Sequence, residues 1–185
     1  YEATFDLEWL EISEKMMLYI LEHFYDSRSS MFFFTSDLDP KLVARKMEVH
    51  DDVVPASNSV LANSLFDLGV IRANNKYKNM AASILNNIKP KMDSYFTSYA
   101  NYANLLLKYT KPFYEVVITG QDAFKKSIKI NNFYSPNKLL IGGDNSNYIP
   151  LLKGKKSNNL FYFICEDGLC KQPTSDIKEA INLLQ

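Results

Sequence analysis

The chain has 185 residues, of which 46% are hydrophobic and 23% charged, with a formal net charge of zero. A chain of this length forms about one domain, with or without a small appendage, and this composition excludes a disordered or collagen-like protein. The longest apolar run, Leu160 to Cys165, is far shorter than the ~18 residues of a membrane helix. We therefore expect a globular protein without a membrane partner, located in the cytoplasm.

The spacing of apolar residues over the first 111 residues predicts several helices. The first covers residues 7–24 behind an N-capping Asp6. A short extended run at 31–34 and a charged, irregular stretch at 36–55 follow. Short connections between the remaining helices indicate antiparallel helical hairpins. Glycine or proline ends each of these helical patterns, which lie between Pro55 and Gly69, Tyr77 and Pro90, and Met92 and Pro112.

Beyond residue 111 the pattern changes to short apolar strands, the first of them β-branched. A strand, a helix and a second strand in sequence predict a small βαβ unit with a right-handed crossover. We expect a domain of helical hairpins at 1–111 and a βα tail packed on it at 112–185, so that the fold is mainly α. The predicted strands lie at 114–118, 138–141 and 160–165, and the predicted helices at 124–130 and 175–184.

The charges are unevenly distributed along the chain. Residues 1–72 contain thirteen acidic and six basic residues, whereas residues 73–185 contain eight acidic and fifteen basic ones. Proteins that bind nucleic acids gather basic residues on one face and use arginine to contact base edges. Here eighteen of the twenty-one basic residues are lysines spread over several elements. We expect no nucleic-acid partner and interpret the asymmetry as two complementary halves.

Cys165 and Cys170 are the only cysteines, and four residues separate them. A structural zinc site needs four ligands, and the only histidines, His23 and His50, are distant in sequence, so we expect no metal. A disulfide across a turn containing Gly168 is geometrically feasible. We favour two reduced thiols, because disulfides are uncommon in the cytosol.

The densest polar cluster lies at residues 45–59. Asn58 and Ser59 fall in the first turn of a predicted helix, where free backbone N–H groups favour an anion or a polarised hydroxyl. Glu48 and Asp51 precede this turn and could form an acid/base pair. The alternative is structural: Ser57 caps the helix, Asp52 supports the same end, and the other charges are solvated. On residue types alone, the structural role is the commoner one.

Five short motifs occur along the chain in a fixed order: Tyr1-Glu2-Ala3-Thr4 with Trp9-Leu10, Arg45-Lys46-x-Glu48-x-x-Asp51, Pro55-x-x-Asn58-Ser59, Pro150-Leu151-Leu152-x-Gly154-Lys155, and Cys165-x4-Cys170-x-x-Pro173. Together they resemble the C-terminal part of the spermatogenesis-associated, thioredoxin-domain-containing protein family. One departure is Ala56, where the family usually has serine.

The resemblance implies a fold and an activity. Family members have an N-terminal thioredoxin-like domain followed by an (α/α) toroid of six helical hairpins, similar to N-acylglucosamine epimerases and six-hairpin glycosidases. The chain, which starts at Tyr1 without an initiator methionine, would then be an incomplete toroid fragment with a small α/β tail, inactive alone and without a cofactor.

Two functions follow from the resemblance, and the cysteines suggest a third. In the first, the fragment belongs to a carbohydrate-active enzyme in which Glu48 and Asp51 are catalytic. The residues expected to bind the carbohydrate are then Arg45, Lys46, Asn58 and Ser59. The alternative is a non-catalytic helical platform that docks the thioredoxin-like domain or another protein partner. Thiol chemistry at Cys165 and Cys170 is the third hypothesis.

Overall fold

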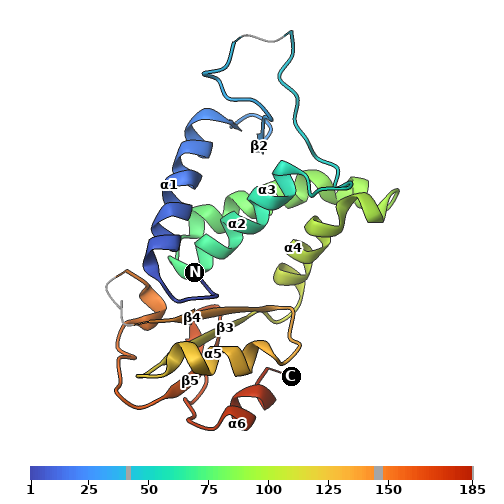
Figure 1. Cartoon of the computed structure of the whole chain (residues 1–185). Coiled ribbons are helices and arrows are strands. Elements are labelled where there is room, and N and C mark those ends of the chain that lie inside the picture. The colour runs from blue at the N-terminus through green and yellow to red at the C-terminus, as the bar shows by residue number, and fades with distance from the viewer. Residues whose placement is uncertain (41–42, 144–147, 185) are drawn as a thin grey trace. The chain divides into compact units, whose positions relative to one another are not determined.

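A computed structural model describes residues 1–40, 43–143 and 148–184 of the chain (Figure 1). The chain forms two compact units, which we call the helical unit and the sheet unit. Each unit is built from segments that are separated in sequence. The helical unit comprises Glu11–Val70 and Asn74–Leu107, and the sheet unit comprises Tyr1–Leu10, Ile71–Ala73 and Lys108–Gln185.

The helices predicted at 7–24, after Pro55 and after Tyr77 are confirmed with small shifts in their boundaries, whereas the one expected from about Met92 is a 3-10 turn from Phe96 followed by an α-helix from Ala100. The carboxylate of Asp6 accepts a hydrogen bond from the Glu8 N–H and so helps to start the first helix. The third helix continues past Pro90, because a proline in the last turn removes only one backbone hydrogen bond. The elements are α1 (Leu7–His23), β1 (Tyr25–Asp26), β2 (Met31–Phe32), α2 (Ser57–Ile71), α3 (Asn75–Met92), the 3-10 turn η1 (Phe96–Tyr99) and α4 (Ala100–Thr110).

The core of the helical unit forms where these helices and the β1–β2 hairpin bury apolar side chains. In α3, apolar positions spaced by three and four residues supply one fully buried face. The largest fully buried side chains of the unit are Phe32, Leu65, Ile84, Ile88, Tyr102 and Leu105. This core fixes the start of α2 and the start of α4, where the candidate site lies.

The sheet unit contains a four-stranded sheet in the order β4-β3-β5-β6. Strands β3 and β4 are parallel and are joined by α5, so the predicted βαβ unit is confirmed; β5 and β6 are antiparallel to their neighbours. The elements are β3 (Tyr114–Thr119), α5 (Ala123–Asn131), β4 (Lys138–Gly142), the 3-10 turn η2 (Pro150–Leu152), β5 (Phe161–Glu166), β6 (Leu169–Cys170) and α6 (Ile177–Asn182).

One face of this sheet carries its own core. Val116, Ile118 and Leu140 pack there with residues of α5 and α6. The ring of Phe5 joins them and lies directly against Gly142, where any Cβ atom would collide with it. The absence of a side chain at residue 142 therefore lets the N-terminal segment pack on the end of β4.

The expected fold class, a mainly α fragment of an (α/α) toroid, is wrong. Helix accounts for 47% and strand for 13% of the structure, and the described residues form six α-helices and two sheets, so the fold is mixed α/β. The short strands at 114–166 are not an appendage of a helical domain. They pair with one another and bury a separate core beneath α5 and α6, whereas a toroid is built from helical hairpins alone.

The helices were compared with the requirements for crossing a membrane. Within residues 1–40, 43–143 and 148–184, no helix combines the length and apolar character that crossing a bilayer requires.

Candidate functional site

The amino end of α2 receives two carboxylates from the irregular segment that precedes it. Oδ1 of Asp51 accepts a hydrogen bond from the Ala56 N–H at 3.0 Å, and Oε2 of Glu48 accepts one from the Ser57 N–H at 3.1 Å. The first turn of α2 contains no acidic residue of its own. These two side chains therefore satisfy N–H groups that the helix cannot pair internally, and their negative charge complements the helix dipole.

Asp51 connects this helix end to a second one. Its Oδ1 accepts from the Ser59 hydroxyl at 2.5 Å, and its Oδ2 accepts from the Asn101 N–H at the start of α4, at 2.9 Å. Asp51 is 9% exposed as a whole residue. Asp51 thus uses both oxygens to hold the beginnings of α2 and α4 together.

Asn58 is fully buried and connects α2 to β2. Its Oδ1 accepts from the Phe32 N–H, and its Nδ2 donates to the Phe32 carbonyl, each at 2.8 Å. The same Nδ2 lies 2.9 Å from the Glu48 carbonyl. The side-chain amide therefore occupies the position that a neighbouring strand would take beside β2.

Arg45 and Lys46 contribute to a different part of the helical unit. The guanidinium of Arg45 lies 4.2 Å from the centre of the Phe33 ring, and its Nη2 donates to the carbonyls of Thr35 and His23. Lys46 is exposed, and its carbonyl accepts from the Phe34 N–H. The hydrogen bonds of Arg45 thus anchor the segment at 23–35 rather than the start of α2.

Side chains do cap the start of α2, as the structural interpretation predicted, but they are not the predicted ones. Ser57 is the first residue of α2, and its hydroxyl is buried without a hydrogen-bond partner among the described residues. Asp52, which we expected to support the helix, is exposed. The capping groups are instead Asp51 and Glu48, whose distance in sequence from the helix hid this role.

Tyr102 is a member of this cluster that the sequence did not reveal. Its ring is fully buried, and its hydroxyl has no hydrogen-bond partner among the described residues. Burial raises the pKa of Tyr102 well above its ordinary value, and the charges of Asp51 and Glu48 raise it further. Aromatic residues at helical spacing predict packing, and no local signal distinguishes Tyr102 from its neighbours.

The two cysteines form a disulfide, so the preference for reduced thiols is wrong. Cys165 and Cys170 lie opposite each other in the β5–β6 hairpin, with Cα atoms 3.8 Å apart. Asp167 and Gly168 both have positive φ, as a two-residue type I′ turn requires. The Gly168 N–H donates to the buried carboxylate of Glu115, which fixes the turn over β3.

The structure therefore brings together four of the six predicted site residues, Glu48, Asp51, Asn58 and Ser59, as a hydrogen-bonded cluster at the start of α2. Among the residues that the structure describes, no group of three or more histidine, cysteine, aspartate or glutamate side chains could hold a metal ion. Comparisons of the chain with protein-family models and with curated proteins gave no match.

Proposed function

We propose that the chain is a non-catalytic docking module that binds a protein partner through α1. The observation that carries the proposal is a row of exposed apolar side chains on this helix. Ile12, Met16 and Tyr19 follow one another at four and three residues, so they share one face. We call these three residues the α1 stripe. Met16 is 60% and Tyr19 50% exposed.

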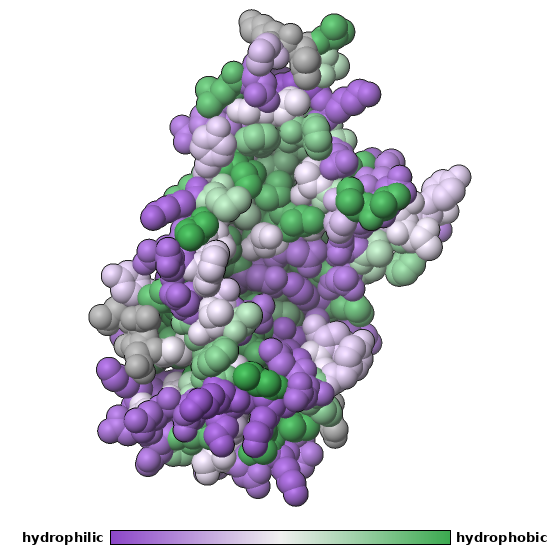
Figure 2. Space-filling view, viewed as in Figure 1, coloured by the Kyte–Doolittle hydropathy of each residue, from purple (hydrophilic) through white to green (hydrophobic). Residues whose placement is uncertain are grey.

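The α1 stripe is separate from the face by which α1 packs. Leu10 and Met17 are buried and lie on the opposite side of the helix. A helix that is apolar on a second, exposed face is typical of one that binds a partner. Exposed hydrophobic residues also stand among hydrophilic ones elsewhere on the visible surface (Figure 2).

The hydrogen bonds at the start of α2 favour docking over catalysis. A general acid or base must reach the substrate, yet Asp51 and Asn58 are buried and bonded to backbone groups. The partner that the family resemblance suggests is a thioredoxin-like domain of the same longer polypeptide. Glu22, three residues after Tyr19, favours a basic residue on the partner beside an apolar centre, whereas Lys15, three residues after Ile12, favours an acidic one.

Calorimetric titration of the chain with the purified thioredoxin-like domain tests this proposal. We expect Met16→Glu to weaken binding at least tenfold, since it places a charge in the apolar contact. Leu18→Glu is the matched control, because Leu18 is 58% exposed but lies on another face of α1. Absence of binding, or equal losses in the two variants, would contradict the proposal.

Carbohydrate chemistry at the start of α2 is the second proposal. The favouring observation is that Glu48 and Asp51 bind the N–H groups of adjacent residues and so lie side by side; Glu48 is also only partly buried. In this proposal the two carboxylates act as acid and base. Glycan binding that is unchanged in Glu48→Gln would count against it.

The compartment in which the protein resides is a further proposal, and here the disulfide opposes the cytoplasmic location expected from the sequence. Disulfides persist mainly in oxidising compartments. The Cys165–Cys170 bond therefore favours a location outside the reducing cytosol. Alkylation of the protein in fresh cell extracts, read by mass spectrometry, would decide whether the pair is oxidised where the protein resides.

A further inference from the structure

Strand β4 is one edge of the four-stranded sheet, and alternate residues of its backbone face away from β3. In a parallel pair, alternate residues direct their N–H and C=O groups to the partner strand. The Tyr114 N–H donates to the Asn137 carbonyl, and Tyr114 is opposite Lys138. Asn137 and then every second residue thus pair with β3, while Lys138, Leu140 and Gly142 face outward.

Side chains of the first two residues cover part of this outward row. Oε1 of Glu2 accepts from the Leu140 N–H at 2.8 Å. The hydroxyl of Tyr1 donates to the Gly142 carbonyl at 2.7 Å and accepts from the Gly142 N–H at 3.2 Å. A carboxylate and a hydroxyl thus reproduce the hydrogen bonds of an added strand, without a strand being there.

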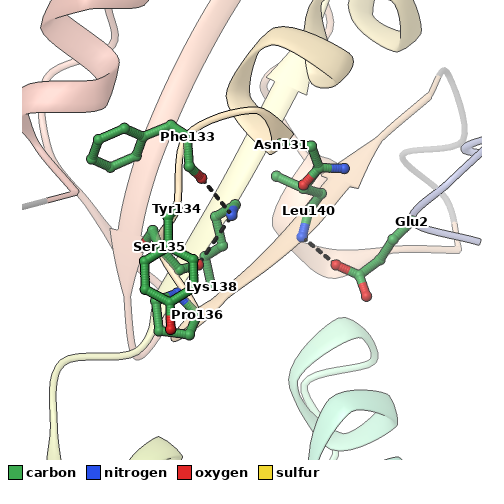
Figure 3. Close-up of a pocket in the computed structure, with 8 residues that line it drawn as sticks. All are labelled: Glu2, Asn131, Phe133, Tyr134, Ser135, Pro136, Lys138 and Leu140. Atoms are coloured by element: carbon green, nitrogen blue, oxygen red, sulfur yellow. Dashed lines mark hydrogen bonds between the residues drawn. The ribbon is translucent and has the colours of Figure 1, made fainter.

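The remaining part of the edge opens into a pocket of about 270 Å³ (Figure 3). Lys138 and Leu140 of β4 form its floor together with Glu2, and the loop between α5 and β4 forms its wall. Tyr134 of this loop is 85% exposed at the pocket. The volume accommodates one or two side chains of medium size beside the backbone of β4.

The charge of the pocket favours an acidic ligand. The Lys138 ammonium is held at the pocket by the carbonyls of Ser135 and Phe133, at 3.0 and 3.3 Å. Partial burial lowers the pKa of Lys138, and the charge of Glu2 opposes that shift. Helix α5, which ends at the pocket, adds two exposed or partly exposed lysines, Lys126 and Lys129, whereas its Lys125 is paired with Asp122.

We propose that the edge of β4 and the adjacent pocket bind an extended acidic peptide of a partner protein, which adds to the sheet as a fifth strand. Glu2 indicates the chemistry that the site accepts. Its carboxylate oxygen accepts a hydrogen bond from the Leu140 N–H, and its negative charge attracts the Lys138 ammonium. The incoming strand displaces Glu2 and Tyr1, supplies main-chain acceptors and donors to Leu140 and Gly142, and places an acidic side chain beside Lys138.

Fluorescence anisotropy with a labelled ten-residue peptide of alternating valine and glutamate tests this site. We expect Glu2→Ala to bind the peptide at least threefold more tightly than the unaltered chain, because the competing side chain is gone. Glu8→Ala is the control, since Glu8 is exposed on α1 and does not line the pocket, and it should leave the affinity unchanged. Lys138→Gln should weaken binding at least fivefold.

A second peptide separates strand addition from charge attraction without any change in the protein. Methylation of alternate backbone nitrogens removes strand hydrogen bonds but keeps every charge, and this peptide should bind at least tenfold more weakly. Equal binding of the two peptides, or absence of binding to both the unaltered chain and Glu2→Ala, would overturn the proposal. So would dimerisation of Glu2→Ala without peptide, in light scattering, because the edge would then pair with a second copy.

This site is independent of the α1 stripe. Met16→Glu alters the proposed docking helix and should leave peptide affinity unchanged, whereas Lys138→Gln should leave binding of the thioredoxin-like domain unchanged. Failure of one proposal is therefore distinguishable from failure of the other.

Discussion

The Ser59 hydroxyl donates to Oδ1 of Asp51 across 2.5 Å, and the same oxygen accepts the Ala56 N–H. A buried carboxylate with this arrangement fixes the first turn of α2 from a residue outside the helix. Its second oxygen reaches the Asn101 N–H of α4, so two helices depend on one side chain.

Replacement of Asp51 by alanine should be strongly destabilising. The change leaves the N–H groups of Ala56 and Asn101 without their acceptor and leaves the Ser59 hydroxyl only the Ala56 carbonyl, which we expect to cost about 2–4 kcal/mol in the free energy of unfolding. Urea denaturation followed by circular dichroism measures this. Asp52→Ala, at an exposed position, should change the free energy by about 0.5 kcal/mol at most. Equal losses in the two variants would contradict the capping role.

Tyr102→Phe should preserve or raise stability at pH 7, by up to about 1 kcal/mol, because it removes a buried hydroxyl without a described partner. The effect should grow at alkaline pH. The pKa of Tyr102 in the folded state lies above its unfolded value of 10.0. Just above pH 10 the Tyr102 hydroxyl therefore ionises only in the unfolded state, and this ionisation favours unfolding. Phenylalanine removes that loss. Denaturation midpoints compared from pH 7 to pH 11 measure the difference, and a constant gap would contradict the burial of this hydroxyl.

Reduction of the disulfide should lower the free energy of unfolding modestly. Cys165 and Cys170 close a loop with a sequence separation of five. Reduction frees the unfolded chain from this loop, and the resulting gain in its conformational entropy is worth about 2 kcal/mol. Denaturation with and without dithiothreitol measures the loss. The double variant Cys165→Ala with Cys170→Ala should be insensitive to the reductant; sensitivity in that variant would assign the effect elsewhere.

Gly142→Ala should destabilise the sheet unit, because the new methyl group collides with the buried ring of Phe5. Overpacking of this kind costs about 1–3 kcal/mol. A double-mutant cycle with Phe5→Leu measures the coupling, and the combined loss should be smaller than the sum of the single losses. Additive losses would show that the two positions do not touch.

The sequence predicts local structure here better than architecture. Periodic apolar residues define α1 and α3, and short apolar runs bounded by glycine and proline, β-branched in β3, define β3 and β4, because such patterns reflect local backbone preferences. The mainly α fold was a wrong prediction, which both the helical patterns of residues 1–111 and the family resemblance had favoured. That resemblance gave no indication that β3, β4 and β5 share a sheet with a core of their own.

The candidate site illustrates the same limit. The gathering of Glu48, Asp51, Asn58 and Ser59 could be predicted, because all four precede or begin one helix. Their partners could not: Phe32 and Asn101 are 26 and 50 residues away along the chain. Only tertiary structure decides whether a polar side chain faces a substrate or a backbone group.

The amide of Asn58 has a consequence for how the helical unit opens. A ribbon of two short strands is marginal by itself, and here the backbone of Phe32 is secured by a side chain of α2. Local fluctuations that melt the first turn of α2 must therefore release the ribbon as well. Deuterium uptake at the Phe32 amide should follow that of α2, so the two segments form one cooperative unit despite the long stretch of chain between them.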